Sequence, residues 1–238
     1  MRLSSELEMV QQLLHSDIDA LGSPLNTLIH AQLPASYPLV RAAVVLTTPT
    51  DLHHNACQSI DADHPPHILL ATALEMLYLA FNVHEVLLTE SSSALNKIAM
   101  GSMILTGDYC LSCSARLATK TNSPLVVELF AQCLKSVSEN HLRHLFDEQQ
   151  DGIPYDVHLE LFYTGMMASA ALSSRLTEEY AALATELSRQ LATQLQFRRI
   201  EKNHQINIDD NYLAALSQAE QERWLGLITW LNQTDGVG

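Results

Sequence analysis

Residues 68–83, ILLATALEMLYLAFNV, form the longest apolar stretch of the chain and constrain its fold more than any other feature. Apolar side chains would fall on nearly every face of a helix here, so the helix should run through the middle of a bundle and not over its surface. Glu75 interrupts the stretch, which falls short of the roughly 20 apolar residues that a bilayer requires. We therefore expect a buried core helix and no membrane span.

The rest of the chain is predicted to be all-α. Leucine and alanine recur at three- and four-residue spacings almost throughout, and no run alternates with a period of two. Ser23-Pro24, Pro65-Pro66 and Ser123-Pro124 are typical of helix starts, because a capping hydroxyl and a first-turn proline favour helix N-termini. Helices are predicted near residues 3–15, from 24, 36–48, from 66, 94–119, 124–146, 154–173, 177–202, 210–216 and 218–232, with a loop over 147–154.

Composition limits the classes of partner. The 238 residues are 47% apolar, which suits one buried core and a single domain over 1–238. A net charge of −14 repels phosphate backbones and anionic lipid, so neither nucleic acid nor a membrane surface is an expected partner. No basic segment followed by an apolar block opens the chain, and the four cysteines lack a disulfide framework spacing. Both features indicate a cytoplasmic protein with reduced thiols.

Five short motifs follow one another along the chain: ALEMLY at 73–78, VHE at 83–85, LTGDY at 105–109, YTG at 163–165 and QFR at 196–198. Their order and approximate spacing resemble those of the trans-isoprenyl (polyprenyl) diphosphate synthases, over roughly residues 36–203. The resemblance implies an isoprenoid-synthase-like bundle of about ten helices around a central cavity, usually dimeric. In that cavity an allylic diphosphate and isopentenyl diphosphate condense with Mg²⁺. Relative to typical members the chain is short at its C-terminus.

The metal-binding motifs of that family are degenerate here. Its members carry two DDxxD motifs on facing helices, and this spacing places the carboxylates on one helical face that holds Mg²⁺. Counted from the retained motifs, the six aspartate positions are occupied by Glu85, Val86, Thr89, Arg199, Ile200 and Asn203. Only one of these is a carboxylate, so no metal site is predicted, and Mg²⁺ would bind only if the degenerate site were active after all.

The substrate-binding cations of the family are also reduced. Its basic GKRxRP segment aligns with residues 37–42, where only Arg41 is retained, and the lysine of its KT pair is replaced by Tyr163, beside Thr164. Removal of one preorganised electrostatic group commonly lowers a rate by about 100- to 1000-fold. Because carboxylates and cations are lost together, we predict a pseudoenzyme with no catalytic residues.

This pattern of loss resembles the small, non-catalytic subunits of heterodimeric prenyl diphosphate synthases, including component I of heptaprenyl diphosphate synthase. The expected role is that of a regulatory or structural subunit in isoprenoid biosynthesis. Its catalytic partner would bear both DDxxD motifs and contact the helices containing residues 107–116 and 124–146. Two alternatives stay open: a standalone binder or sensor of an isoprenoid diphosphate or other hydrophobic ligand, and an active prenyltransferase with rearranged ligands.

Residues near the first degenerate motif have two interpretations each. Glu85 is either a metal ligand or a polar residue at the surface or a cavity rim. In the family, the positions of Ala80 and Phe81 line the prenyl tunnel, with Tyr78 one turn below. Phe81 is therefore either a tunnel floor or an ordinary core residue.

Near the second degenerate motif, the pair Arg198-Arg199 either binds a phosphate without metal or forms an exposed basic helix end. The motif residues His84, Gln196 and Arg41 complete the set of candidate ligand contacts.

Three further groups of metal-ligating residue types fit ordinary structural roles better. Cys110 and Cys113 form a CxxC inside a predicted helix, without the second pair that a zinc site needs. A second group lies at a helix end, where a solvated face is expected, and a third surrounds a probable loop, where solvated histidines are expected. The second group is His141, His144 and Asp147. The third is His53, His54, Asp61, Asp63, His64 and His67.

Overall fold

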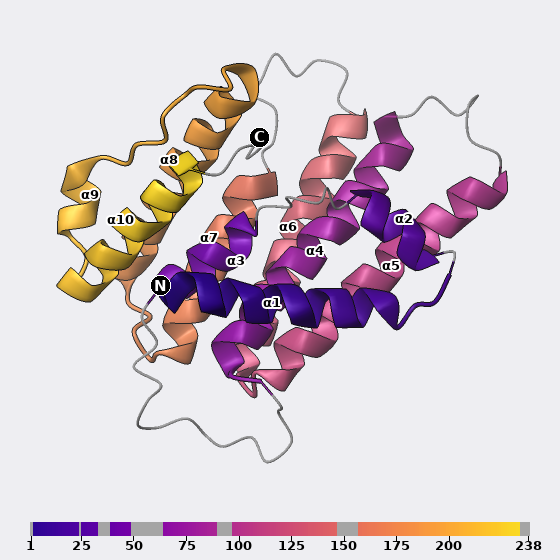
Figure 1. Ribbon diagram of the computed structural model, residues 1–238, viewed down its shortest axis with the longest axis horizontal. Coiled ribbons are helices and arrows are strands. Elements are labelled where there is room, and N and C mark those ends of the chain that lie inside the picture. Colours follow the sequence, from indigo (N-terminus) through magenta and orange to yellow (C-terminus); the bar gives the residue numbers. More distant parts are fainter. Residues whose placement is uncertain are drawn as a thin grey trace.

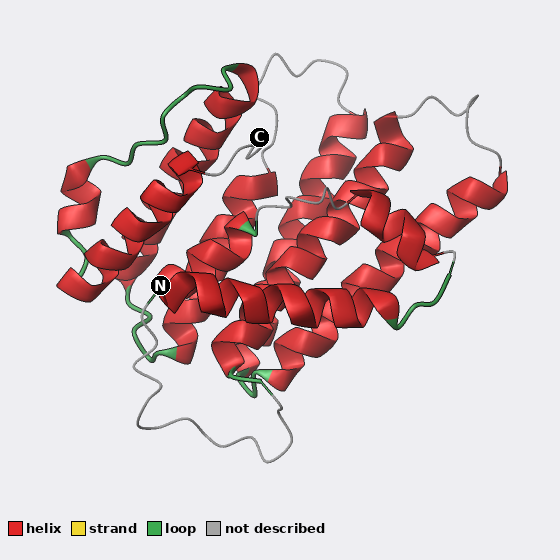
Figure 2. Ribbon diagram, in the orientation of Figure 1, coloured by secondary structure: helices red, strands yellow, loops and turns green. Residues whose placement is uncertain are grey.

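The structure, a computed structural model, describes residues 2–23, 25–32, 39–48, 64–89, 97–146 and 157–233. Within these ranges it contains ten α-helices and no β-strand (Figure 2). The helices are α1 (Arg2–Asp19), α2 (Leu25–Gln32), α3 (Val40–Thr47), α4 (Pro66–Thr89), α5 (Lys97–Lys120), α6 (Pro124–Phe146), α7 (Val157–Leu172), α8 (Glu178–Ile200), α9 (Asp210–Ala214) and α10 (Gln218–Gln233).

The predicted helices are confirmed, and most boundaries agree to within three residues. Helix α6 begins at Pro124 as expected, and the Ser123 hydroxyl accepts a hydrogen bond from the Val126 N–H at 3.4 Å. The largest differences are of four residues: α1 continues beyond the predicted end at residue 15, and α3 begins at Val40 instead of residue 36. Pro24, Cys57 and the loop predicted over 147–154 lie outside the described residues.

Helix α4 occupies the centre of the bundle, as its sequence predicts. Every residue from Ile68 to Leu77 is buried, and α4 packs against α1, α2, α3, α5 and α7. Figure 1 shows α1 lying across the helices of this central group, while α8, α9 and α10 pack together at one side. By length and composition Pro66–Glu85 could cross a membrane, but 78% of its apolar window is buried against protein, as in the core helix of a globular bundle.

Side-chain hydrogen bonds and small residues fix the neighbours of α4. The Ser114 hydroxyl of α5 donates to the Ala73 carbonyl at 2.8 Å. Helix α7 approaches through Gly165, where a Cβ atom would lie only 2.8 Å from Leu74 Cδ1. The thiols of Cys110, Cys113 and Cys133 are buried and free, as predicted. The part of α4 around Ala73 and Leu74 is therefore held closely against α5 and α7.

Candidate functional site at the centre of the bundle

The C-terminal part of α4 carries the residues of the first degenerate motif. His84 packs directly on Gly107 of α5, where a Cβ atom would lie 2.2 Å from the imidazole Nε2. The same Nε2 lies 3.7 Å from Asp108 Oδ1. Glu85 is exposed, and of Val86 and Thr89 only the helical backbone is described. The glycine of the LTGDY motif thus makes room for the histidine of the VHE motif.

The second degenerate motif lies at the C-terminal end of α8 and just beyond it. Ile200 is 79% exposed, and Asn203 is an exposed residue of the turn after the helix. Arg198 is buried instead, and its Nη1 donates to the Leu231 carbonyl of α10 at 2.6 Å. Arg198 therefore fastens α10 to α8, so the hypothesis of an exposed basic pair is wrong for this residue. Gln196 and Arg199 are exposed.

Arg41, the retained residue of the basic segment, forms a buried ion pair. Its guanidinium is 4% exposed and makes two contacts with Glu75 Oε2, at 3.0 Å from Nε and 2.9 Å from a terminal nitrogen. The other oxygen of Glu75 accepts from the Ala42 N–H at 2.8 Å. The guanidinium also lies 3.7 Å from the centre of the Tyr78 ring, a cation–π distance. The positive charge of Arg41 and these two N–H donors thus face α4.

A histidine that the sequence analysis did not single out connects these groups. His158, at the start of α7, lies 5.2 Å from the Tyr78 ring and 5.9 Å from the Phe162 ring, measured between ring centres. Arg199 Nη2 lies 2.7 Å from His158 Nε2, so the guanidinium donates to a neutral imidazole. Arg41, Tyr78, His158 and Arg199 form a continuous cluster across α3, α4, α7 and α8, called the arginine–histidine cluster below.

Burial, followed by the charges of Arg41 and Arg199, lowers the pKa of His158 from its ordinary value near 6.5 to about 3. The folded protein therefore keeps this imidazole neutral while the unfolded chain takes up a proton below pH 6.5. Above that pH, His158 does not lower the free energy of unfolding. As the pH falls towards 3, the unfolded chain alone takes up the proton, so the free energy of unfolding decreases. We expect its share of the unfolding free energy to decrease by on the order of 1 kcal/mol per pH unit between about pH 6 and 4.

Chemical denaturation at pH 7, 6 and 5 measures this effect. His158→Gln should make the free energy of unfolding depend less steeply on pH, because glutamine does not titrate. If the pH dependence is the same in His158→Gln, His158 takes up its proton as readily in the folded state as in the unfolded chain.

The remaining predicted residues lie apart from the arginine–histidine cluster. Thr164 is buried against α6, where its hydroxyl bonds the Cys133 thiol, and Tyr163 packs on the core. Phe81 is 6% exposed within the core. Its surroundings are those of a core residue, and its role at a tunnel stays a prediction.

The donor set of the degenerate motifs does not fit Mg²⁺. That ion takes oxygen ligands in octahedral geometry, and the six positions offer one carboxylate. Across the described parts of the chain no group of three or more His, Cys, Asp and Glu residues is arranged to hold a metal. Of the other groups proposed from the sequence, the structure does not describe the side chains of His141 and His144. Asp147, His53, His54, Asp61 and Asp63 also lie outside the described residues.

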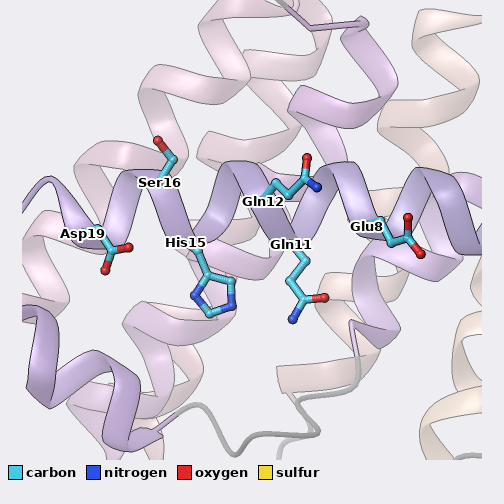
Figure 3. A pocket seen from close by; sticks show the side chains of 6 residues that line it. All are labelled: Glu8, Gln11, Gln12, His15, Ser16 and Asp19. Atoms are coloured by element: carbon cyan, nitrogen blue, oxygen red, sulfur yellow. The ribbon is translucent and has the colours of Figure 1, made fainter.

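A separate recess of about 500 Å³ lies along α1, far in sequence from the motifs (Figure 3). It is lined by polar side chains of this one helix: Glu8, Gln11, Gln12, His15, Ser16 and Asp19. His15 stacks on His30 of α2 at 5.5 Å, and His30 lies 2.9 Å from Asp19. These contacts join α2 to α1, which accounts for His15 and Asp19 in this recess.

Comparison with solved structures identifies the fold. An isoprenoid synthase family member from Thermotoga neapolitana matches with a TM-score of 0.69 and 14% identity, over 96% of this chain and 99% of the other. A decaprenyl diphosphate synthase from Rhodobacter capsulatus matches with a TM-score of 0.61 and 18% identity, over 99% of this chain and 79% of the other. A Caulobacter crescentus polyprenyl synthase complexed with calcium and isoprenyl diphosphate matches with a TM-score of 0.60 and 16% identity, over 98% of this chain and 84% of the other.

No protein-family model and no curated protein matches the chain at the level of sequence. At identities of 14–18% the structural matches establish shape and not chemistry. The chain has the all-α, isoprenoid-synthase-like fold, in which it is a structural relative of the polyprenyl diphosphate synthases over nearly its whole length.

Proposed function

We propose that this protein is a non-catalytic relative of the polyprenyl synthases that acts as the regulatory or structural subunit of a heterodimeric prenyl diphosphate synthase. The observation that carries the proposal is the buried Arg41–Glu75 pair. The cation retained from the substrate-binding segment is directed at the protein's own core helix, and its guanidinium is 4% exposed. A residue held in this way supports the fold and not a diphosphate.

The charges at the degenerate motifs support the same role. Departure of a diphosphate requires cations that neutralise the developing negative charge. The Caulobacter synthase of this fold is complexed with calcium and isoprenyl diphosphate. In the present chain Arg198 bonds the Leu231 carbonyl and Arg199 bonds His158. Without the aspartates, these side chains stabilise contacts among α7, α8 and α10.

The exposed side chains of α5 and α6 support the proposal of a partner subunit. These helices are adjacent, and both carry exposed large apolar side chains: Ile104, Leu105, Leu125, Val127, Leu134 and Leu142. Leu105 is 63% exposed. Several large apolar side chains exposed on two adjacent helices favour an interaction site there. A catalytic subunit of the same fold would cover this surface, which we call the α5–α6 face.

Co-expression with a DDxxD-bearing polyprenyl synthase from the same organism tests the proposal. We expect a stable complex of one copy of each chain, and a change in the chain length of the prenyl product made by the catalytic subunit. A homodimer that neither binds the synthase nor alters its product would contradict the proposal.

A second function is favoured by one observation, the exposed Arg199 guanidinium beside a neutral His158 at the end of α8. Arginine binds phosphate oxygens through paired N–H donors without a metal. The protein would then bind an isoprenoid diphosphate as a sensor. Farnesyl diphosphate should raise the melting temperature without Mg²⁺, and Arg199→Ala should abolish the increase, while absence of any increase in the original protein removes this function.

A further inference from the structure

Helix α6 carries a stripe of apolar and small side chains on its outer side. The stripe consists of Val127, Ala131, Leu134, Ser138 and Leu142, which follow one another at intervals of three or four residues and are all exposed. Such intervals place side chains on one face of a helix. Val127, Leu134 and Leu142 are 37%, 38% and 53% exposed, so three large apolar side chains of this face meet solvent. The small side chains of Ala131 and Ser138 between them leave room for another helix to approach closely.

Two charged residues of opposite sign line one edge of this stripe. Glu128 and Lys135 are exposed and lie seven residues apart, about two helical turns, so both lie on the same edge. Their contacts within the chain are local: Glu128 Oε1 accepts from Gln132 Nε2 at 3.3 Å, and Lys135 Nζ lies 3.7 Å from Glu139 Oε1. Exposed contacts of this kind contribute little to stability and are easily replaced. Both charges are therefore available to a second chain.

Antiparallel pairing with α6 of a second copy of the chain matches these charges. A two-fold axis that passes close to Ala131 brings together residues at equal distances before and after it. Glu128 lies three residues before Ala131 and Lys135 four after it, and the difference of one residue is about 1.5 Å along the helix. Glu128 then meets the partner's Lys135, and the same contact is formed a second time, because a two-fold interface is self-complementary. Val127 and Leu134, four residues before and three after the axis, are brought together on the other edge.

We propose that α6 is a self-association surface, which binds α6 of a second copy of this chain in an antiparallel, two-fold symmetric contact. Parallel pairing is disfavoured because it places each charge beside the same charge of the partner. The charge distribution along the chain favours the same surface. Residues 97–146 contain five lysines and arginines and three aspartates and glutamates, a net charge of +2 in a chain with −14. Two copies repel each other least where their carboxylates are fewest.

The contact would regulate the function proposed above. Helix α6 is part of the α5–α6 face, so a second copy of the chain and a catalytic subunit exclude each other there. The free chain would then be a homodimer that dissociates before it joins the synthase. This consequence rests on the proposed function, whereas the self-association does not, and it is tested without a synthase.

Sedimentation equilibrium of the full chain alone tests the proposal, at an ionic strength of about 50 mM, where screening of exposed charges is weak. We expect a dimer with a dissociation constant on the order of 10 µM. Lys135→Glu and Glu128→Lys should each weaken the dimer by at least about tenfold, because each brings like charges together at two places. An equimolar mixture of the two variants should regain the original affinity, because every charge pair in the mixed dimer again joins opposite signs.

Lys202→Glu is the matched control. It makes the same charge reversal at an exposed position in the turn after α8, and should change the dissociation constant by less than about threefold. Circular dichroism should show the same helix content in all three variants, since the substituted residues are exposed. An original chain that is monomeric at about 100 µM, well above the expected dissociation constant, would overturn the proposal. A dimer that Lys135→Glu leaves unchanged, or variants whose mixture stays monomeric, would also overturn it, and neither result bears on the proposed complex with the synthase.

Discussion

Replacing Glu75 with glutamine is expected to lower the free energy of unfolding by about 3–5 kcal/mol, the usual cost of removing one member of a buried ion pair. The amide is nearly identical in shape, but it removes the negative charge that contacts the Arg41 guanidinium, in a residue that is 4% exposed. If its oxygen keeps the bond from the Ala42 N–H, its NH₂ group faces the donors of Arg41. The loss is a large part of the roughly 5–15 kcal/mol that keeps a domain folded, and urea denaturation measures it directly.

Two comparisons isolate this effect. Glu85→Gln makes the same chemical change at an exposed position of the same helix and should alter stability by less than about 0.5 kcal/mol. The double replacement Arg41→Met with Glu75→Leu should recover most of the loss, because apolar residues of similar volume remove both buried charges together. A Glu75→Gln variant as stable as the original protein would show that Arg41 has another counter-charge.

Replacing Leu105 with glutamate is expected to weaken association with the catalytic subunit by at least about 100-fold, equivalent to roughly 3 kcal/mol. The proposed interface would bury the new carboxylate without a partner, which is costly. Leu105 is 63% exposed, so the substitution should leave the fold of the isolated chain intact. Surface plasmon resonance with the immobilised synthase, together with circular dichroism of the variant, separates the two effects.

Ile200→Glu is the matched control. Ile200 is also a large exposed apolar residue, at 79%, but it lies at the end of α8 and not on the α5–α6 face. Its replacement should change the dissociation constant by less than about threefold. If Ile200→Glu disrupts the complex and Leu105→Glu does not, the partner covers the α8 side of the bundle.

The helices were predictable because their signals are local. The three- and four-residue period of leucine and alanine, together with Ser123-Pro124, placed α6 at both ends, and the apolar faces of residues 68–83 placed α4 in the core. The error at the end of α1 has a tertiary origin. The extra turn is held by Asp17, whose carbonyl accepts from Tyr109 and whose carboxylate pairs with Arg116, both on α5.

The candidate site could be predicted only in part. The motifs singled out Arg41 and Tyr78 as candidate ligand contacts, but a pattern of residue types does not show that Arg41 donates to Glu75, 34 residues away. His158 gave a weak signal, its position four residues before the buried Phe162 on a helical face. Arg198 and Arg199 are adjacent in sequence, yet helical geometry directs one to α10 and the other to α7. Such pairings depend on the packed fold.

The most direct test of the account is turnover of labelled isopentenyl diphosphate with geranyl or farnesyl diphosphate by the purified chain, with and without Mg²⁺. The account predicts that product formation by the chain alone stays at background in both conditions, and that prenyl product appears only when the DDxxD-bearing subunit is added. Mg²⁺-dependent product formation by the chain alone, abolished by Glu85→Gln, would contradict it.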